Sequence, residues 1–435
     1  MYRRRSMSMI IGACCIGLLF MCSALSLSAE PVKIAVMLRG DSSQREAFAK
    51  EIIPAFEARH PGIVAEWEPT ASGWQQRMVV SYAAGVAPDV TEMFSTFSQE
   101  WAEAGMLLDL RPYVQRDLKA SDIKDFFPQI WNAGVLQHGS LKGIMYGVPR
   151  YVNLIGSVAY NVNKLGAAGL APIETLDAQG RWNWESFREY LLKLTQRAPD
   201  GRTTQWGLCA PSSRWSTMLL AGGGRLFNYP EDPYEFMLNR PEAIHALEYW
   251  QTLYANDRVV SNAWWTTFEK GEAGIDLTGS EVYGKWGSEV IRDRFEWNLA
   301  PLPLGPAGRG SSSAKDQYGI IATTKHPNEA WAFVKFCISP EGQRIMMSSS
   351  GVMPMRSSLL REFVKLFPGK NMQYMADVAP QAFIDQKAVT VEAKRVVALI
   401  DNAVNASAIR NEKSVKQAIE EITPQIEAIL QGLPR

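Results

Sequence analysis

The stretch MYGVPRYVNLIGSVAYN, residues 145–161, decides how the fold is interpreted. The run 154–160 has the apolar, β-branched and aromatic character of a buried strand. Pro149, Arg150 and Asn153 interrupt that strand pattern with a missing backbone donor, a cation and an amide. Neither one continuous strand nor an ordinary surface turn explains a charge at this place. We therefore interpret the stretch as a passage of the chain from one domain into another.

The first 29 residues have the three parts of a secretory signal peptide. Arginines occupy positions 3–5, residues 7–27 are almost wholly apolar or small, and small residues precede Glu30. An uncleaved membrane anchor is the alternative, because about 20 apolar residues can span a bilayer, but the small-residue end favours cleavage. A lipoprotein signal fits less well, since two bulky residues precede Cys22. We expect export to the periplasm and a mature chain that begins near Glu30.

The mature chain is long enough for two domains and has a nearly balanced charge. The full sequence holds 45 basic and 45 acidic residues, so loss of the leader with its three arginines leaves a net charge of −3. Because binding to nucleic acid would require a basic face, we exclude nucleic acid as a partner. Three of the five cysteines belong to the leader. The remaining pair, Cys209 and Cys337, is no disulfide framework, and we expect two buried thiols.

Strand and helix patterns alternate along the chain, which predicts an α/β fold with parallel strands. Strand-like runs begin the chain at 32–38, 63–67 and 87–90, and helical patterns separate them. Further on, apolar residues at helical spacing predict helices at Trp184–Leu194, Ala243–Ala255 and Ala330–Ile338. Ligands of such sheets bind beyond the carboxyl ends of the strands. The loops after the strands, and the interrupted stretch itself, are therefore candidate site positions.

The sequence contains no recognisable catalytic or metal-binding motif. Its four histidines are far apart and form no HxxxH or HExxH pair, and it has neither a GxSxG elbow nor a phosphate loop. The glycine run 222–224 lacks the GK[ST] ending that a phosphate loop needs. Paired carboxylates for sugar hydrolysis can be brought together by folding, but no pattern points to them. We expect a protein that is not an enzyme and needs no cofactor or metal.

Nine segments of the mature chain, in order, carry a resemblance to a known family. They are FEARHPGIVAEWE, YAAGVAPDV, EAGMLLDLRPYV, IMYGVPRYVNLIGSVAYNVNKLGAAGL, WNWESFREYLLKLT, FEKGEAGIDLTGS, APLPLGPAG, KHPNEAWAFVKFCISPEGQ and GVMPMR. Each segment alone is a weak signal, whereas the ordered set covers essentially the whole mature chain. Together they resemble the family 1 extracellular solute-binding proteins, the sugar-type binding components of ABC importers.

The resemblance implies an α/β, two-lobed periplasmic-binding-protein fold with hinge crossovers and a ligand cleft between the lobes. The segment PRYVN would then be the first crossover, a short linker that bends on closure and faces the ligand. Its counterparts are expected near 296–299 and near 338–340. The first lobe would comprise residues 30–150 plus 298–338, and the second lobe residues 151–297 plus 339–435.

Two demands of a sugar ligand select the candidate site residues within this fold. Its C–H faces stack on aromatic planes, and its hydroxyls need bidentate or charge-assisted hydrogen bonds. The candidates are Arg39, Phe94, Ser95, Asp316, Gln317 and Tyr318 in the first lobe, Arg150, Tyr151 and Asn153 in the crossover, and Trp215, Trp264, Trp265, Ser280, Glu281 and Arg356 in the second lobe.

Some of these candidates have plainer alternatives. Trp264 and Trp265 are adjacent, so we expect one of them in the cleft and the other in the core. Arg356 suits a surface ion pair as well as a ligand contact. If several arginines converge, an anionic ligand such as a sugar acid becomes a candidate.

The expected function is the capture of a sugar, an oligosaccharide or a related polyol or sugar acid by lobe closure. The protein, expected to be a monomer, would deliver this ligand to the permease subunits of an ABC importer in the inner membrane. Two alternatives stay open. One is a secreted carbohydrate-active enzyme on a related scaffold, and the other is a binding protein that reports to a chemoreceptor or sensor kinase.

Overall fold

The structure is a computed structural model that describes most of the chain after the expected leader, residues 1–29, which lies outside the described part. The described residues are 30–38, 42–70, 73–94, 98–136, 139–228, 232–263, 265–277, 279–280, 283, 286, 291, 294–314, 316–384 and 392–433. At 42–44, 69, 94, 233, 314 and 384 the description covers the backbone alone.

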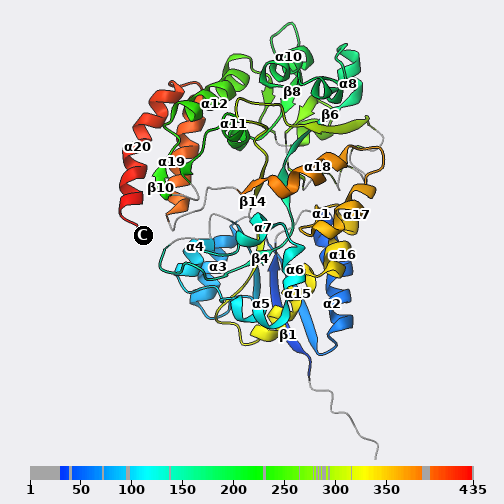
Figure 1. Ribbon diagram of the computed structural model, residues 1–435, viewed down its shortest axis with the longest axis vertical. Coiled ribbons are helices and arrows are strands. Elements are labelled where there is room, and N and C mark those ends of the chain that lie inside the picture. Colours follow the sequence, from blue (N-terminus) through cyan, green and yellow to red (C-terminus); the bar gives the residue numbers. More distant parts are fainter. Residues whose placement is uncertain are drawn as a thin grey trace, which may run out of the picture.

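Two β-sheets with helices around them form two lobes, one in the lower half and one in the upper half of Figure 1. This arrangement is the two-lobed α/β fold that the sequence predicted. A third, small sheet lies between the lobes and contains two of the segments that connect them.

The first lobe is built on a five-stranded sheet in the order β2-β1-β3-β15-β4. Its strands are β1 (Val32–Leu38), β2 (Ile63–Pro69), β3 (Val90–Phe94), β15 (Asp316–Ile320) and β4 (Val148–Pro149). The first three are parallel, as predicted, because a helical segment connects each of them to the next. Strands β15 and β4 come from later in the chain and pair antiparallel, so the sheet is mixed.

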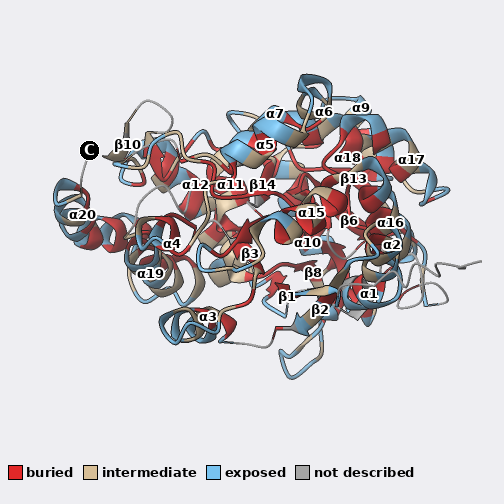
Figure 2. Ribbon diagram, turned by 90° about the horizontal axis from the view of Figure 1, so that it is seen from below, coloured by how far each residue is buried: buried red, intermediate tan, exposed pale blue. Residues whose placement is uncertain are grey.

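Helices cover both faces of this sheet and bury their apolar sides against it (Figure 2). They are α1 (Ser42–Ala47), the π-helical turn η1 (Phe48–Ile52), α2 (Ile53–Arg59), α3 (Trp74–Ala83), α4 (Ser98–Glu103), α5 (Arg111–Asp117), α6 (Ala120–Lys124), α7 (Pro128–Asn132), α15 (Pro327–Ile338) and α16 (Pro340–Ser350). Helix α15 contains the whole of the predicted helix Ala330–Ile338 and begins one turn earlier, where Pro327 occupies the first helical position.

The second lobe is built on a six-stranded sheet in the order β11-β8-β12-β6-β13, with β7 added to the side of β8. Its strands are β6 (Ser157–Asn161), β7 (Gln196–Arg197), β8 (Thr203–Cys209), β11 (Val260–Ser261), β12 (Ala273–Asp276) and β13 (Trp297–Pro301), and β9 (Phe227–Asn228) pairs separately with β10 (Asp232–Phe236). Strands β8, β11 and β12 are parallel, whereas β6 runs antiparallel to β12 and β13.

Helices from residue 162 onward surround this sheet, and α12, α19 and α20 form the left side of the molecule in Figure 1. They are α8 (Val162–Ala167), α9 (Ile173–Ala178), α10 (Trp184–Leu194), α11 (Trp215–Ala221), α12 (Pro241–Gln251), α13 (Thr266–Glu269), α17 (Leu360–Lys365), α18 (Met372–Val378), α19 (Ala393–Val404) and α20 (Val415–Gln431). Helix α10 has the predicted limits because Asn183 and Ser186 exchange side chain–backbone hydrogen bonds of 3.1 and 3.0 Å at its start.

Two connections between the lobes run side by side as antiparallel strands. The first crosses at β5 (Asn153–Ile155), directly after β4, and the second at β14 (Ser312–Ala314), directly before β15. Their register pairs Ser312 with Ile155 and Ala314 with Asn153, and β16 (Phe383–Ile384) adds to the far side of β14. The stretch 145–161 therefore contains a crossover. Its strands β4, β5 and β6 belong to three different sheets.

The later crossings lie downstream of the positions expected from the sequence. Residues 296–299 were expected to cross, but β13 keeps the chain in the second sheet by pairing with β6 over five residues. The chain leaves that sheet after Pro301 and crosses at β14. Helix α16 packs on α1, and its Glu341 forms an ion pair with Arg59 at the end of α2, so this helix, expected in the second lobe, contacts the first.

Candidate functional site

The sheet edges that should hold a ligand face each other across the two crossovers. In the first sheet, the end of β3 at Phe94 pairs with Asp316, and the backbone N–H of Arg150 donates to the carbonyl oxygen of Asp316 at 2.9 Å. In the second sheet, the ends of β8 and β12 meet at Cys209 and Asp276. Both edges lie at the carboxyl ends of the parallel strands, where ligands of α/β sheets bind.

The edge of the first sheet contains a buried cluster of three charges. Nη1 of Arg150 lies 2.6 Å from Oε2 of Glu92 and 3.7 Å from Oδ1 of Asp316. The three residues are 0–2% exposed. Burial is the largest single influence and opposes the charge of the guanidinium, but Glu92, Asp316 and the two neighbouring tyrosines together outweigh it, so the pKa of Arg150 stays above its ordinary value. The cluster is an internal ion pair with one additional carboxylate.

Three aromatic rings enclose the guanidinium of Arg150. Its Cζ lies 5.5 Å from the ring centre of Phe48, 5.1 Å from that of Tyr151 and 6.0 Å from that of Tyr318. A cation at these distances is attracted by the negative ring faces. Tyr151 and Tyr318 are 4% and 0% exposed, so their rings contribute to holding Arg150 inside the protein.

Asp316 is the member of the cluster with unused hydrogen-bonding capacity. Neither of its side-chain oxygens forms a hydrogen bond within the described part of the chain, although the side chain is buried. Its neighbour Gln317 is likewise buried. A Cβ added at Gly147 would lie only 2.7 Å from Oε1 of Gln317, so a glycine is needed there. A buried carboxylate normally has hydrogen-bond donors around it, so Asp316 is available to a donor group of a ligand.

Ser280 joins the end of the second sheet to the first crossover. Its Oγ accepts a hydrogen bond from the backbone N–H of Leu154 and donates one to the carbonyl oxygen of Val152, both at 3.0 Å. The residue is fully buried. Through these two bonds Ser280 fixes the path of the crossover, and Asn153 lies between the two bonded residues.

Arg356 forms an ion pair, as one of its two expected roles required, but a buried one rather than one at the surface. Its Cζ lies 4.2 Å from the ring centre of Phe126, its Nε donates to the carbonyl oxygen of Ile338 at 2.8 Å, and its Nη1 donates to Asp125 at 3.0 Å. Only 3% of the residue is exposed. Arg356 therefore connects the segment after α16 to the first lobe from inside.

The other predicted residues are spread over the two lobes. Trp215 begins α11 and is 2% exposed, and Trp265 is half-buried against the core. Four predicted residues and one side chain lie outside the described part of the chain: Arg39, Ser95, Trp264 and Glu281, and the side chain of Phe94. The structure thus brings together Arg150, Tyr151 and residues 316–318, with Asn153 and Ser280 beside them at the crossover.

Glu92 is a member of the site that sequence reasoning missed. It is the central residue of the strand VTEMF and is fully buried. A carboxylate in the middle of an apolar strand was the available signal, because a buried acid needs a cation as partner. Arg150 is that cation, but it is 58 positions away in the sequence.

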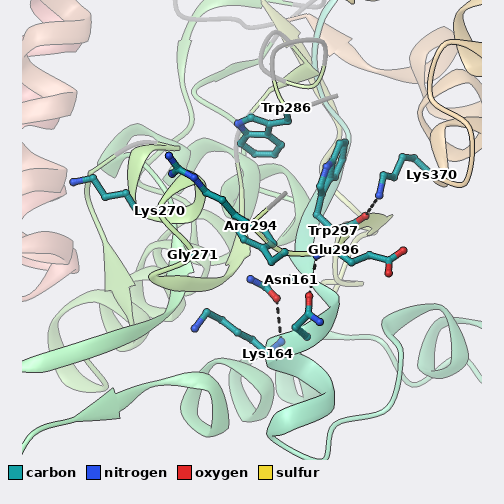
Figure 3. A pocket seen from close by; sticks show the side chains of 11 residues that line it. Asn161, Lys164, Lys270, Gly271, Trp286, Arg294, Glu296, Trp297 and Lys370 are labelled. Carbon is teal, nitrogen blue, oxygen red and sulfur yellow. Dashed lines mark hydrogen bonds between the residues drawn. The ribbon is translucent and has the colours of Figure 1, made fainter. Parts of the chain in front are cut away.

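Two cavities lie in different places relative to the lobes. One, of about 600 Å³, is lined by Glu100 of α4 and by Glu392, Lys394, Arg395 and Ala398 at the start of α19, so both lobes contribute to it. The other, of about 890 Å³, is lined by residues of the second lobe and by Lys370 of the segment packed on it (Figure 3). The larger cavity is therefore not the ligand cleft expected between the lobes.

The described residues include no group of three or more His, Cys, Asp or Glu side chains that could hold a metal ion. No helix in the described part of the chain is both long and apolar enough to cross a membrane. Cys209 and Cys337 are both buried thiols that form no disulfide within the described part of the chain, as expected.

Comparison with known proteins relates this geometry to one family. The family Bacterial extracellular solute-binding protein matches residues 40–344. A lipoprotein of Streptomyces antibioticus from the oleD 5' region is 25% identical over 337 residues, which are 73% of this chain and 69% of the relative.

Solved structures share the fold over nearly the whole chain. An ABC substrate-binding protein of Listeria monocytogenes in complex with cycloalternan is 18% identical with a TM-score of 0.78, and the match covers 92% of this chain and 100% of the other. UgpB from Mycobacterium tuberculosis in complex with glycerophosphocholine is 18% identical with a TM-score of 0.76, over 93% and 99% of the two chains.

Proposed function

The chain belongs to the bacterial extracellular solute-binding proteins, and on this premise we propose that it captures a small hydroxylated solute between its lobes. The solute class is a sugar, an oligosaccharide or a related polyol, and the closed protein delivers it to the permease subunits of an ABC importer. The protein works after export, in the periplasm or anchored to the membrane by its amino terminus.

This proposal rests mainly on one observation. The edges of the two sheets at which ligands are expected face each other across the pair of crossovers. Residues of both edges approach the crossover, namely Asp316 from the first sheet and Ser280 from the loop after β12. A solute that contacts both edges binds the closed arrangement better than the open one, and this difference in affinity shifts the population toward closure.

The charge at the edge of the first sheet supports an uncharged ligand over a sugar acid. Arg150 is already paired with Glu92, and Arg356 is bonded to Asp125 and to a carbonyl oxygen, so neither guanidinium is free to bind a carboxylate. Asp316, in contrast, offers acceptor oxygens. Hydroxyl groups of a sugar donate well to a carboxylate, and such charge-assisted bonds are among the stronger ones in proteins.

A thermal-shift screen of the mature chain tests this function. Neutral sugars, oligosaccharides and polyols form one panel, and the matching sugar acids form a second panel. A ligand at about 100 times its Kd stabilises the folded state by about 2.7 kcal/mol, which is a readily measured increase in Tm. We expect a neutral compound to give the increase and its acid counterpart to give less.

Scattering and product analysis then separate binding from catalysis. A compound that raises Tm should also reduce the radius of gyration, because the lobes close on it, and it should be recovered unchanged after prolonged incubation. Stabilisation without compaction contradicts capture by lobe closure. Release of a shortened sugar contradicts a pure binding role.

A further inference from the structure

The 890 Å³ cavity lies within the second lobe and is separate from the crossover region (Figure 3). Asn161 at the end of β6 and Trp297 at the start of β13 pair with each other and form one side of it. Ser157, at the other end of β6, is the residue next to the crossover. The cavity is therefore about one strand, roughly 13 Å, away from the edge that faces the first lobe.

Four cationic side chains from separate segments line this cavity. Lys164 comes from α8, Lys270 follows α13, Arg294 precedes β13, and Lys370 precedes α18. Glu296 is the single acidic residue among the described residues that line it.

Within the described part of the chain, three of these cations donate side-chain hydrogen bonds, and each acceptor is a neutral group. Nζ of Lys164 donates to Oε1 of Gln205, Nη1 of Arg294 to the carbonyl oxygen of Glu269 at 3.0 Å, and Nζ of Lys370 to the carbonyl oxygen of Trp297 at 2.6 Å. A lysine ammonium has three donors and a guanidinium has five, so each group retains donors.

No carboxylate of the described chain lies within ion-pair distance of the four cations. Among the described residues none of the four takes part in a salt bridge, whereas Arg344, for example, is paired with Glu362. Burial lowers the pKa of Lys164 and of Lys370, and the carboxylates that raise it again act only from a distance. No contacting carboxylate thus neutralises the positive charge of the cavity. A bound anion would stabilise the charged forms of the lysines against the effect of burial.

Aromatic rings supply a flat apolar wall beside the cations. Trp286, Phe295 and Trp297 line the cavity, and the rings of Trp286 and Trp297 meet edge to face at 5.6 Å. Both indoles are held in place, since Nε1 of Trp286 donates to Glu269 at 2.9 Å and the ammonium of Lys370 lies 4.9 Å from the ring centre of Trp297. A fixed apolar wall next to convergent polar groups is the usual construction of a small-molecule site.

We propose that this cavity is a second binding site, distinct from the junction of the lobes, for a small organic anion with a planar or apolar body. The carboxylate, phosphate or sulfonate of the anion lies between Lys270 and Arg294 and toward the two other lysines. Its body lies against Phe295, the partly exposed aromatic ring of the lining, with Trp286 and Trp297 packed nearby. Its occupation does not require closure of the lobes, because all lining residues belong to one lobe or to the segment packed on it.

A titration with 8-anilinonaphthalene-1-sulfonate, a fluorescent aromatic anion, tests the site on the whole mature chain. The wild type should bind one equivalent saturably, and benzoate should displace the probe whereas benzyl alcohol, its neutral counterpart, should not. Lys270→Glu and Arg294→Gln should each weaken the affinity at least tenfold. Lys193→Glu is the matched control, because Lys193 is an exposed lysine of the same lobe outside the cavity, and it should change the affinity less than twofold.

Three results would overturn the assignment: no saturable binding, equal displacement by benzoate and benzyl alcohol, or equal effects of Lys270→Glu and Lys193→Glu. Lys270 is exposed and forms no described hydrogen bond through its side chain, so its replacement leaves the fold intact even if Arg294→Gln does not. The thermal shift produced by a solute at the lobe junction should be the same in wild type and Lys270→Glu. The probe titration therefore tests the anion site, and the thermal shift by a solute tests the proposed function. A negative result in one measurement leaves the other proposal unaffected.

Discussion

Arg150 and Glu92 form a 2.6 Å ion pair at the point where the chain leaves the first sheet, and neither side chain reaches solvent. The arginine begins the crossover, and the glutamate belongs to the central part of the sheet. The pair therefore attaches the moving connection to the rigid lobe. The second carboxylate, Asp316, begins the strand that follows the other crossover, so both connections end at the same buried cation.

Replacement of Arg150 by Ala should lower the free energy of unfolding by about 3–5 kcal/mol, because two carboxylates would remain buried without a cation. Urea unfolding at pH 7 measures this change. Arg344→Ala is the control, since its pair with Glu362 is half-exposed and should contribute less than about 1 kcal/mol. Equal losses in the two variants would show that Arg150 is not needed to compensate buried charge.

Ser280→Ala should destabilise the protein by about 1–3 kcal/mol, because it leaves the buried N–H of Leu154 and the carbonyl oxygen of Val152 without their partner. The same change should broaden the distribution of lobe orientations seen by small-angle scattering of the unliganded protein. Ser348→Ala removes only a hydroxyl on the exposed side of α16 and serves as the control. A scattering profile identical to that of the wild type would exclude a role of Ser280 in fixing the crossover.

Asp117 should contribute to stability in a way that depends on pH below neutrality. Hydrogen bonds from Arg116 and from Nε1 of Trp331, opposed by burial, hold its pKa at about 2. Because the folded-state pKa is depressed, the stabilisation is complete above the unfolded value of about 3.9 and is lost as the pH falls toward 2. The exposed fraction of the side chain, 18%, reduces the effect to about 1 kcal/mol.

The variant Asp117→Asn should therefore be less stable than the wild type at pH 6, and the difference should shrink between pH 4 and pH 2. Denaturant unfolding at several pH values gives this difference directly. Asp200→Asn is the control, since Asp200 is largely exposed and its nearest cation is 3.9 Å away. A wild-type advantage that stays constant down to pH 2 would contradict the assigned pKa.

Cys209 and Cys337 should be unreactive in the native protein. Burial raises the pKa of the Cys337 thiol to about 12 and that of Cys209 well above its ordinary value, so the reactive thiolate is scarce at neutral pH. Ellman's reagent should label neither thiol in buffer and both in guanidinium chloride. A Tm that falls on addition of dithiothreitol would contradict the free state of the two cysteines.

Local sequence patterns correctly predicted those helices and strands whose limits are set by residues adjacent in the sequence. Helix α10 has the predicted limits because its cap, Asn183, and its apolar stripe are both local signals. The parallel pairing of β1, β2 and β3 followed from their alternation with helices. Arg150 was selected as a candidate because it interrupts a strand pattern. The structure places it at the edge of the sheet, where it is buried and paired with Glu92.

Contacts between distant segments were not predictable in the same way. The family resemblance placed a crossing near residues 296–299, but β13 pairs there with β6, more than 130 positions earlier in the chain. Glu92 and Asp316 meet Arg150 only after three strands have assembled in one sheet. Periodicity reports which face of an element is buried, and it contains no information about which element covers that face.

The register between β5 and β14 limits the kind of motion that the two lobes can perform. Since Ser312 is paired with Ile155 and Ser313 with Leu154, the two crossing strands cannot slide along each other without breaking their ladder. The lobes can rotate about this two-stranded connection, which acts as a hinge. Translation of one lobe over the other is blocked. An insertion of one residue in either strand should therefore tilt the resting orientation of the lobes, because it shifts the pairing of its neighbour as well.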